Sequence, residues 1–449
     1  MKQTQKVIAV MLFLTIVLSL LPLGGCGEED PDTVTVRYLN FKPEIAEKYE
    51  ELATAYEKET GVRVIVDTAA NNTYEQTLTA KMSGSEAPTL FQINGPRGYA
   101  SWKSYCADLK DTQLYKHLTD KTLAVTDGDK VVGIPYVVEG YGILYNKAVT
   151  DRYFALTDRD KSLASMDDVR NFATLKTLVE DMQAHKTALG IDGVFASTSL
   201  KSGEDWRWQT HLANLPIYYE FKDGNVDLSS DATKKITFRY AAQFKNLFDL
   251  YLDNSVTDKK RLGSKTVTDS MSEFALEKCA MVQNGNWAWG QIADVSGNKV
   301  KEQNIKYLPL YTGVSGEEKQ GLCIGTENFY AINAKATAAE QKAAADFIYW
   351  LYSSEMGKKY VTEQFGFIAP FDTFDDAERP NDPLAHEILD WMQKDGVTSV
   401  PWNFTLFPSL QFKDDFGASL LKYAQGNKNW DAVVSDMVDS WRKESAAAA

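Results

Sequence analysis

The feature that most constrains the fold is the alternation of short apolar segments with amphipathic ones. Near the N-terminus, strand-like segments at 34–38 and 62–66 flank an amphipathic stretch over 43–59. A helical pattern over 74–82 and a buried strand over 87–93 follow in the same order. Such alternation predicts β-α-β units, which place helices on the faces of a mostly parallel sheet. We therefore predict an α/β protein that binds its ligand beyond the carboxyl ends of the strands.

The length of the chain indicates more than one folding unit. With 449 residues, it exceeds the size at which a single hydrophobic core usually stops growing. Further helical patterns lie near 170–186, 234–252, 268–278 and 337–351, so the alternation continues into a second α/β region. We expect at least two lobes, each with its own core.

The N-terminus has the pattern of an export signal. Two lysines precede an apolar run over 7–21, which leads into Leu23-Gly24-Gly25-Cys26. The run is shorter than the ~20 residues that a spanning helix needs, so we interpret residues 1–25 as a signal peptide. The four residues are similar to a lipobox, which predicts a lipid anchor on Cys26; a secreted protein with an incidental cysteine is the alternative. The acidic segment 26–32 would then be a flexible tether.

Charge and composition argue against several classes of function. The formal net charge of −14 disfavours nucleic acid as a partner. Four histidines are scattered singly, and the cysteines after Cys26 form no CxxC pair, so we expect neither a metal site nor a cofactor. The sequence has no Gly-x-Ser-x-Gly elbow and no convincing pair of acids. We therefore expect a protein that is not an enzyme.

The chain is rich in large aromatic residues, with ten Trp and 22 Tyr. A sugar presents apolar C–H faces and a ring of hydroxyls, so its site needs flat aromatic platforms with hydrogen-bonding groups at their edges. Aromatic side chains also build hydrophobic cores, and composition alone does not separate the two uses.

Four sequence blocks carry a resemblance to a known family. They lie at 87–91, 134–147, 279–289 and 331–347. None is specific alone, but their order across residues 33–445 resembles the family 1 extracellular solute-binding proteins, and within them the maltose-binding protein branch. The resemblance implies a two-lobed periplasmic-binding-protein-like fold of type II, in which the lobes close about a hinge around the ligand.

The resemblance also implies where the chain crosses between the lobes. The three expected crossings are 138–140, 323–325 and 369. The lobes would comprise residues 33–138 with 326–369 and residues 140–322 with 371–445. The glycines at two of these crossings suit a backbone that changes its dihedral angles on closure, although glycine is also common at strand ends.

Two residues lie at the centre of the ligand site that the resemblance implies. Trp287 follows a buried strand in the turn Asn284-Gly285-Asn286, where the family carries a sugar-stacking tryptophan. Glu139 lies at the first crossing, where a carboxylate can accept hydrogen bonds from neighbouring sugar hydroxyls. A packing role for Trp287 and a hinge salt bridge for Glu139 are the alternatives.

Four further residues are candidates for the same site. Trp206 approximately matches a sugar-facing aromatic of the family, and Trp208 would take this role if the alignment shifted by two residues. Asn94 lies where the family places polar contacts of the first lobe, or is simply a turn residue. Trp402 would either add a platform or pack in the core. Gln92 stands where the maltose-binding branch carries an aromatic, which argues against maltose as the ligand.

Together these features predict a monomeric, lipid-anchored substrate-binding protein of an ABC importer on the extracytoplasmic face of a bacterial membrane. It would capture a carbohydrate and deliver it to the permease subunits. Abundant aromatics favour an oligosaccharide, because each added ring can use another platform. A secreted glycoside hydrolase and a carrier of a polyamine or peptide are the rival hypotheses.

Overall fold

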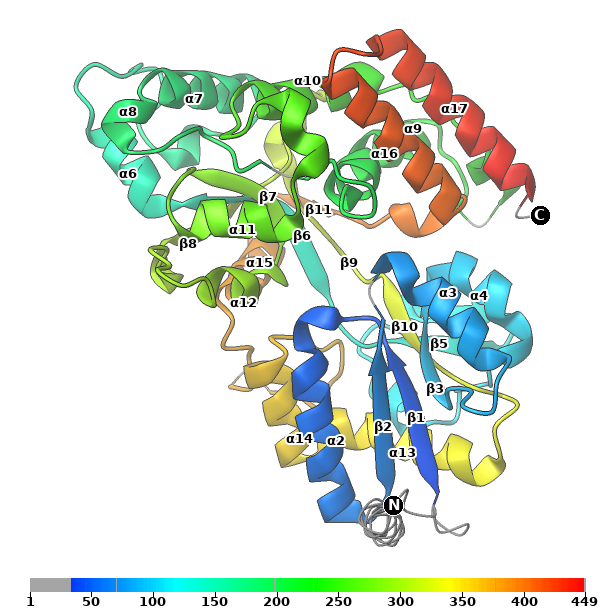
Figure 1. Cartoon of the computed structure of the whole chain (residues 1–449). Coiled ribbons are helices and arrows are strands. Elements are labelled where there is room, and N and C mark those ends of the chain that lie inside the picture. The colour runs from blue at the N-terminus through cyan, green and yellow to red at the C-terminus, as the bar shows by residue number, and fades with distance from the viewer. Residues whose placement is uncertain (1–33, 70, 198, 229, 376, 448–449) are drawn as a thin grey trace, which may run out of the picture.

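The computed structural model describes residues 34–447 apart from 70, 198, 229 and 376. The expected signal peptide, the lipid-attachment residue Cys26 and the tether lie outside the described residues. Figure 1 shows two lobes joined by extended segments, each built on a β-sheet with helices packed against it. The predicted two-lobed α/β fold is confirmed. Among the residues described, no helix combines the length and the apolar composition that crossing a bilayer requires.

The first lobe is built on a six-stranded sheet. In order across the sheet, its strands are β2 (Arg63–Thr68), β1 (Thr35–Asn40), β3 (Leu90–Asn94), β10 (Asn328–Ile332), β5 (Lys130–Pro135) and β4 (Val125–Asp127). Its helices are α2 (Ala46–Thr60), α3 (Asn71–Met82), α4 (Gly95–Trp102), α5 (Gln113–Lys116), α13 (Ala338–Ser353), α14 (Glu355–Lys359) and the π-helical turn η11 (Tyr360–Gln364). Helix α2 buries Tyr49, Leu52 and Tyr56, which lie one turn apart on one face, and it ends at Gly61 in the left-handed conformation.

The second lobe is built on a five-stranded sheet. Its strands run in the order β11 (Thr398–Val400), β9 (Gln320–Gly325), β6 (Glu139–Asn146) and β7 (Met281–Gly285), with β8 (Ile305–Leu308) also paired to β6. Its helices are α6 (Lys147–Ala155), α7 (Phe172–Ala184), α8 (Lys186–Leu189), the π-helical turn η6 (Arg207–Leu212), α9 (Ala213–Asp223), α10 (Ala241–Asp253), α11 (Val267–Ala275), α12 (Ala288–Ala293), α15 (Pro383–Gln393), α16 (Leu410–Ala424) and α17 (Trp430–Ala447). Apolar clusters fill the interior of each lobe separately.

Both sheets are mixed, so the prediction of a mostly parallel sheet is wrong. In the first lobe, β1 pairs in parallel with β2 and β3, but β10 is antiparallel to β3 and β5. In the second lobe, β6 is antiparallel to β7, β8 and β9. The reason lies in how the chain connects the two lobes. One strand carries the chain out of a lobe through the hinge and a neighbouring strand carries it back, so the two strands run in opposite directions. Helical crossovers, which enforce parallel pairing, join only part of each sheet.

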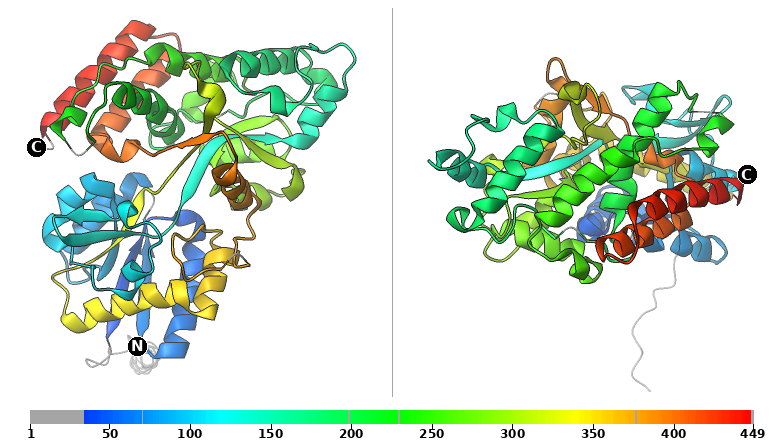
Figure 2. Two further views of the ribbon diagram at one scale, coloured as in Figure 1. Left: turned by 180° about the vertical axis from the view of Figure 1, so that it is seen from behind. Right: turned by 90° about the horizontal axis from the view of Figure 1, so that it is seen from above.

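The chain passes between the lobes at three places, which lie side by side in both views of the molecule (Figures 1 and 2). The first passage joins β5 to β6, the second joins β9 to β10, and the third leads from η11 to α15. An isolated bridge between Val138 and Ile368 ties the first and third passages together. These three passages form a narrow connection about which the lobes can move.

Candidate ligand-binding cleft

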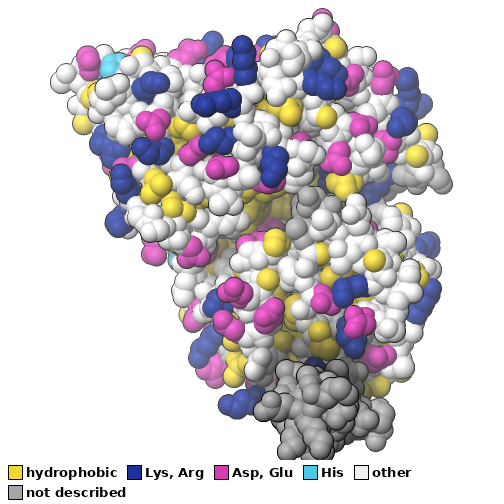
Figure 3. Space-filling model, viewed as in Figure 1, with side chains coloured by type: hydrophobic (Ala, Val, Ile, Leu, Met, Phe, Trp, Pro, Cys, Tyr) yellow, Lys and Arg dark blue, Asp and Glu magenta, His cyan; other side chains and the backbone are white. Residues whose placement is uncertain are grey.

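Two cavities lie between the lobes. The larger one, of about 750 Å³, is lined by Lys42 and Glu139 near the hinge and by Trp287 of the second lobe. The smaller one, of about 460 Å³, is lined by Asn94 of the first lobe and Phe404 of the second, among others. Figure 3 shows the hollow between the lobes from outside, with apolar side chains along it. The side chains therefore leave an open cleft that both lobes line.

Trp287 is fixed at the junction of a buried strand and a short helix. Strand β7 is fully buried, and Trp287 caps the N-terminus of α12 directly after it. The indole lies against the backbone of Gly285, where an added Cβ would fall 2.2 Å from two ring carbons. Asn286 forms two hydrogen bonds with Gly140 at the hinge. Its side-chain Oδ1 accepts from the backbone N–H of Gly140 at 2.9 Å, and its backbone N–H donates to the carbonyl of Gly140. The ring is thus held by backbone on one side and faces the larger cavity on the other.

Five rings of the second lobe form a continuous wall between the two cavities. We call Trp206, His211, Trp287, Trp402 and Phe404 the aromatic wall. The ring centroids of Trp287 lie 5.9 Å from Trp206, 5.4 Å from His211 and 6.4 Å from Trp402. Phe404 lies 5.0 Å from Trp402 and lines the smaller cavity, whereas Trp287 lines the larger one. Of the five rings, Trp287 and Phe404 line the cavities, whereas His211 and Trp402 are buried behind them.

The π-helical turn η6 and the residue before it supply two members of the wall. Trp206 is the N-cap of η6, and the guanidinium of Arg207 lies 4.3 Å above the centre of its ring. His211 stacks on Tyr141 with a centroid distance of 4.2 Å. Burial lowers the pKa of His211 well below its ordinary value, and the cations of Arg207 and Lys413 lower it further. His211 is therefore a neutral imidazole at pH 7, with one donor and one acceptor nitrogen.

Glu139 forms an ion pair at the hinge. Its Oε1 lies 2.5 Å from Nζ of Lys42, and Glu44 lies 3.6 Å from the same ammonium. Lys42 and Glu139 are only 7% and 5% exposed. Burial tends to lower the pKa of Lys42, but the carboxylates of Glu139 and Glu44 outweigh it and raise this pKa overall. Glu139 thus forms the hinge salt bridge that the sequence left open, while it also lines the larger cavity.

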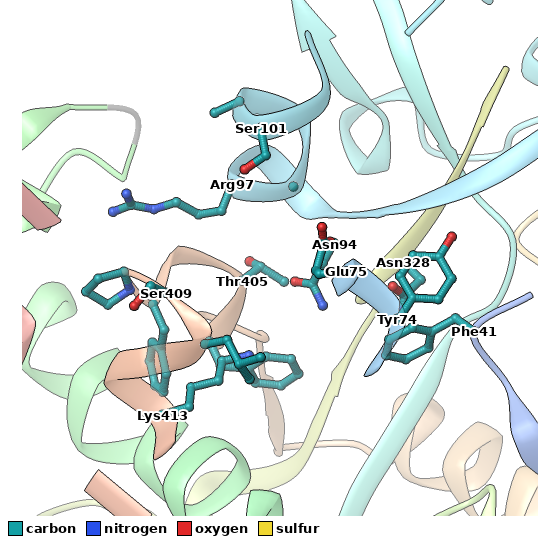
Figure 4. A pocket seen from close by; sticks show the side chains of 16 residues that line it. Phe41, Tyr74, Glu75, Asn94, Arg97, Ser101, Asn328, Thr405, Ser409 and Lys413 are labelled. Atoms are coloured by element: carbon teal, nitrogen blue, oxygen red, sulfur yellow. The ribbon is translucent and has the colours of Figure 1, made fainter. Parts of the chain in front are cut away.

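The structure places Asn94 at the cleft, whereas Trp402 is 7% exposed, is not among the residues that line either cavity and packs in the core of the second lobe. Asn94 ends β3, is the N-cap of α4 and donates a hydrogen bond of 2.7 Å to Glu327; it lines the smaller cavity, as Figure 4 shows. Trp402 belongs to the aromatic wall and packs against Gly325, where an added Cβ would lie 2.7 Å from its Cγ. Its indole N–H has no hydrogen-bond partner among the described residues.

Trp208 lies in the core, not at the cleft. Its side chain is 0% exposed, and its ring packs edge-on against Phe248 and Tyr251. Two residues along a helical turn point to different sides, so Trp206 and Trp208 could not both reach the cleft. The prediction that Trp208 contacts the ligand is therefore wrong, because its side chain packs in the core.

Sequence reasoning missed three polar side chains that line the cleft, namely Lys42, Arg97 and Lys413, and it missed His211, which is buried beside Trp287. The sequence could have indicated Lys42, because it lies two residues after β1, at the carboxyl end of a strand, where ligands of α/β proteins bind. His211 was counted only as one of four scattered histidines. Within the part of the chain that the structure describes, no group of three His, Cys, Asp or Glu side chains is arranged to hold a metal ion.

A two-lobed α/β molecule with a hinge of three passages and an aromatic cleft between its lobes defines a class of protein that closes around a small ligand. The sequence profile of the bacterial extracellular solute-binding proteins matches residues 51–388. The chain belongs to this family.

One curated relative is the melibiose/raffinose/stachyose-binding protein MelE of Bacillus subtilis (strain 168). It is 28% identical over 152 residues, which are 32% of this chain and 35% of MelE. The match thus spans about a third of the relative's length.

Solved structures match over nearly the whole chain. They include a chitin oligosaccharide binding protein (TM-score 0.69, 18% identity, 92% of this chain and 99% of that one). The binding protein RafE in complex with raffinose gives a TM-score of 0.66 at 18% identity, over 92% and 100% of the chains. A sugar transporter protein from Bacillus licheniformis in complex with stachyose gives 0.65 at 17%, over 92% and 100%. At these identities the likeness shows the fold.

Proposed function

We propose that this protein captures a carbohydrate, an oligosaccharide in particular, for an ABC importer. The observation that carries the proposal is the aromatic wall, which runs from one cavity of the cleft to the other. Successive sugar rings can stack their C–H faces on such a wall. The names of MelE and of the structures bound to raffinose and stachyose are consistent with this class of ligand.

Polar atoms along the wall would orient the sugar. The indole N–H of Trp402 and Nδ1 of His211 are buried without a hydrogen-bond partner among the described residues. A buried polar group without a partner costs about 1–3 kcal/mol, and a sugar hydroxyl would remove that cost. Glu139 and Asn94 lie toward the two ends of the cleft and would contribute further contacts. Hinge closure would then bring the first lobe onto the ligand.

The protein would release its sugar unchanged. Glycoside hydrolysis needs two carboxyl groups facing each other across the scissile bond. At the hinge, the carboxylate of Glu139 is already engaged by Lys42. The rival hydrolase hypothesis would need this pair to separate before any chemistry.

We also propose that the mature protein is a monomer anchored through a lipid on Cys26, with permease subunits as its partner. The lipobox-like sequence Leu23-Gly24-Gly25-Cys26 supports this location, and so does membership of an extracellular family. In a Gram-positive host, the native protein should partition with the membrane, and the Cys26→Ser variant should not. Equal distribution of both between membrane and medium would contradict the anchor.

Calorimetric titration with raffinose, stachyose, chitotriose and xylotriose tests the carbohydrate hypothesis, with analysis of the recovered sugar. We expect at least one of them to bind and to be recovered intact. Trp287→Ala should weaken that binding by at least about tenfold, or 1.4 kcal/mol. Trp391→Ala is the matched control, because Trp391 lines a separate pocket of about 440 Å³ on the second lobe.

The other outcomes separate the rivals. Shortened products would support the hydrolase. A polyamine or peptide that raises the melting temperature, when no sugar does, would support the other carriers. Unchanged affinity in Trp287→Ala would remove the aromatic wall as the site.

A further inference from the structure

The two cavities of the cleft differ in how their cations are neutralised. In the larger cavity, Lys42 is paired with Glu139 and approached by Glu44. The smaller cavity is lined by two cations, Arg97 and Lys413, and within the described ranges neither has a carboxylate within 4.0 Å. Unpaired cations are unexpected in a chain with a net charge of −14, since acidic partners are in excess.

Arg97 enters the smaller cavity from the first lobe. It lies on α4, and its Nη2 donates a long hydrogen bond of 3.4 Å to the backbone carbonyl of Leu406 in the second lobe. Burial lowers the pKa of Arg97, and no charged neighbour offsets this effect. A guanidinium has five N–H donors in a planar fork. Among the described residues the other N–H groups of this guanidinium have no hydrogen-bond partner, so they can bind a ligand.

Lys413 enters the same cavity from the second lobe, as Figure 4 shows. Burial lowers its pKa, and the more distant charges of Glu327 and Asp414 only partly oppose this. The residue lies near the start of α16, a helix that begins at Leu410 after the N-cap Ser409. The N-terminus of a helix disfavours a cation and favours an anion. Lys413 is therefore doubly unfavourable in the absence of an anionic partner.

The nearby carboxylates are already engaged elsewhere. Glu75, the one acid among the residues that line the smaller cavity, accepts a hydrogen bond of 2.9 Å from Nε1 of Trp102. Glu327 accepts from Asn94. Burial raises the pKa of Glu75, and its hydrogen bond with Trp102 opposes this shift. The remaining polar lining residues are uncharged donors or acceptors, namely Asn94, Ser101, Asn328, Thr405 and Ser409.

We propose that the smaller cavity binds an anionic substituent of the sugar, a carboxylate or a sulfate ester, between Arg97 and Lys413. The inference rests on the proposed function, because it assigns the class of carbohydrate that the cleft takes. The neutral part of the oligosaccharide lies along the aromatic wall, and the acidic unit lies beyond Phe404. Since the two cations belong to opposite lobes, the anion also favours closure of the cleft.

Binding of matched acidic and neutral sugars tests this inference. The probes are trigalacturonate and glucuronosyl-xylotriose, each with its carboxyl-reduced counterpart, and a sulfated galactotriose with its desulfated form. We expect at least one acidic form to bind about tenfold or more tightly than its neutral counterpart, a preference that weakens as salt rises. A preference within the carboxylated pairs identifies a uronic acid, and one within the sulfated pair identifies a sulfate ester.

Variants show whether the two cations cause the preference. The double variant Arg97→Gln/Lys413→Met should bind both members of the pair with similar affinity. Lys147→Met is the matched control, because Lys147 is an exposed residue of α6 that pairs with Asp151 and is not among the residues that line either cavity; it should keep the preference. Circular dichroism melts verify that each variant is folded.

The failures are distinguishable. Neutral sugars that bind as tightly as all the acidic ones, or more tightly, would overturn the inference and leave the proposed function intact. A preference that survives in the double variant would also overturn it. If no saccharide of either kind binds, the proposed function fails as well.

Discussion

At the scale of single residues, Asp205 is unusual because its carboxyl group is buried and forms no ion pair with any residue that the structure describes. It is 3% exposed, and its Oδ2 lies against Gly417, where an added Cβ would be 1.9 Å away. Burial, with a smaller contribution from the charge of Asp414, raises the pKa of Asp205 to about 7. The backbone carbonyl of Asp205 accepts hydrogen bonds from the backbone N–H groups of Trp208 and Gln209, so this residue also supports the start of η6.

We predict that Asp205→Asn makes the protein more stable at pH 8. The folded pKa lies above the unfolded value, so the folded state takes up a proton before the unfolded state does. Stability is therefore highest at low pH and falls as pH rises through about 7. From pH 5 to pH 8, this group should lower the free energy of unfolding by about 2–3 kcal/mol, and the variant should lack this loss. Urea denaturation at both pH values measures the difference.

Two further carboxyl groups, those of Asp382 and Asp151, bear on how the urea measurement is interpreted. Burial also raises the pKa of Asp382 to about 7, so Asp205→Asn should keep part of the pH dependence. Asp151→Asn is a control, because Asp151 is exposed on α6 and pairs only with Lys147; it should change stability by less than about 1 kcal/mol. A pH dependence in Asp205→Asn as steep as in the native protein would contradict the prediction.

At the scale of elements, the sequence was sufficient for most helices and strands. The periodicity over 74–82 and 337–351 anticipated α3 and α13, because amphipathic patterns and capping residues act locally. Strand direction was not predictable from the same patterns. It depends on the chain's return through the hinge, which is a contact between segments far apart in sequence.

In the candidate site, too, some residues were predictable from local sequence patterns and others were not. Trp287 was predictable because a turn after a buried strand is a local signal. His211 was not, because its ring lies 4.8 Å from that of Trp206, five residues earlier. In an α-helix residues five apart do not share a face, but η6 is a π-helical turn with i to i+5 hydrogen bonds. The two rings meet because the helix is locally π-helical, and the 3.6-residue periodicity of an α-helix does not reveal such an irregularity.

At the scale of the whole molecule, the pair between Lys42 and Glu139 links the first lobe to the hinge. Lys42 follows β1 of the first sheet, and Glu139 is the first residue of β6 in the second sheet. The ammonium also lies 5.9 Å from the ring centre of Trp287, across the cleft. The boundaries of the two lobes, which the sequence resemblance suggests, remain a proposal that limited proteolysis can address.

We predict that breaking this pair from one side destabilises the protein more than removing it completely. Lys42→Met leaves the carboxylate of Glu139 buried without its partner, which should cost about 3–5 kcal/mol of unfolding free energy at pH 7. In Lys42→Met/Glu139→Gln neither charge of the pair remains, so most of that loss should be recovered, although Glu44 also loses its contact with the ammonium. Lys48→Met, which breaks the exposed pair with Glu51, should cost less than about 1 kcal/mol. Urea unfolding of the native protein, Lys42→Met, Glu139→Gln and the double variant gives the coupling energy; losses that simply add in the double variant would show that the pair does not hold the first lobe to the hinge.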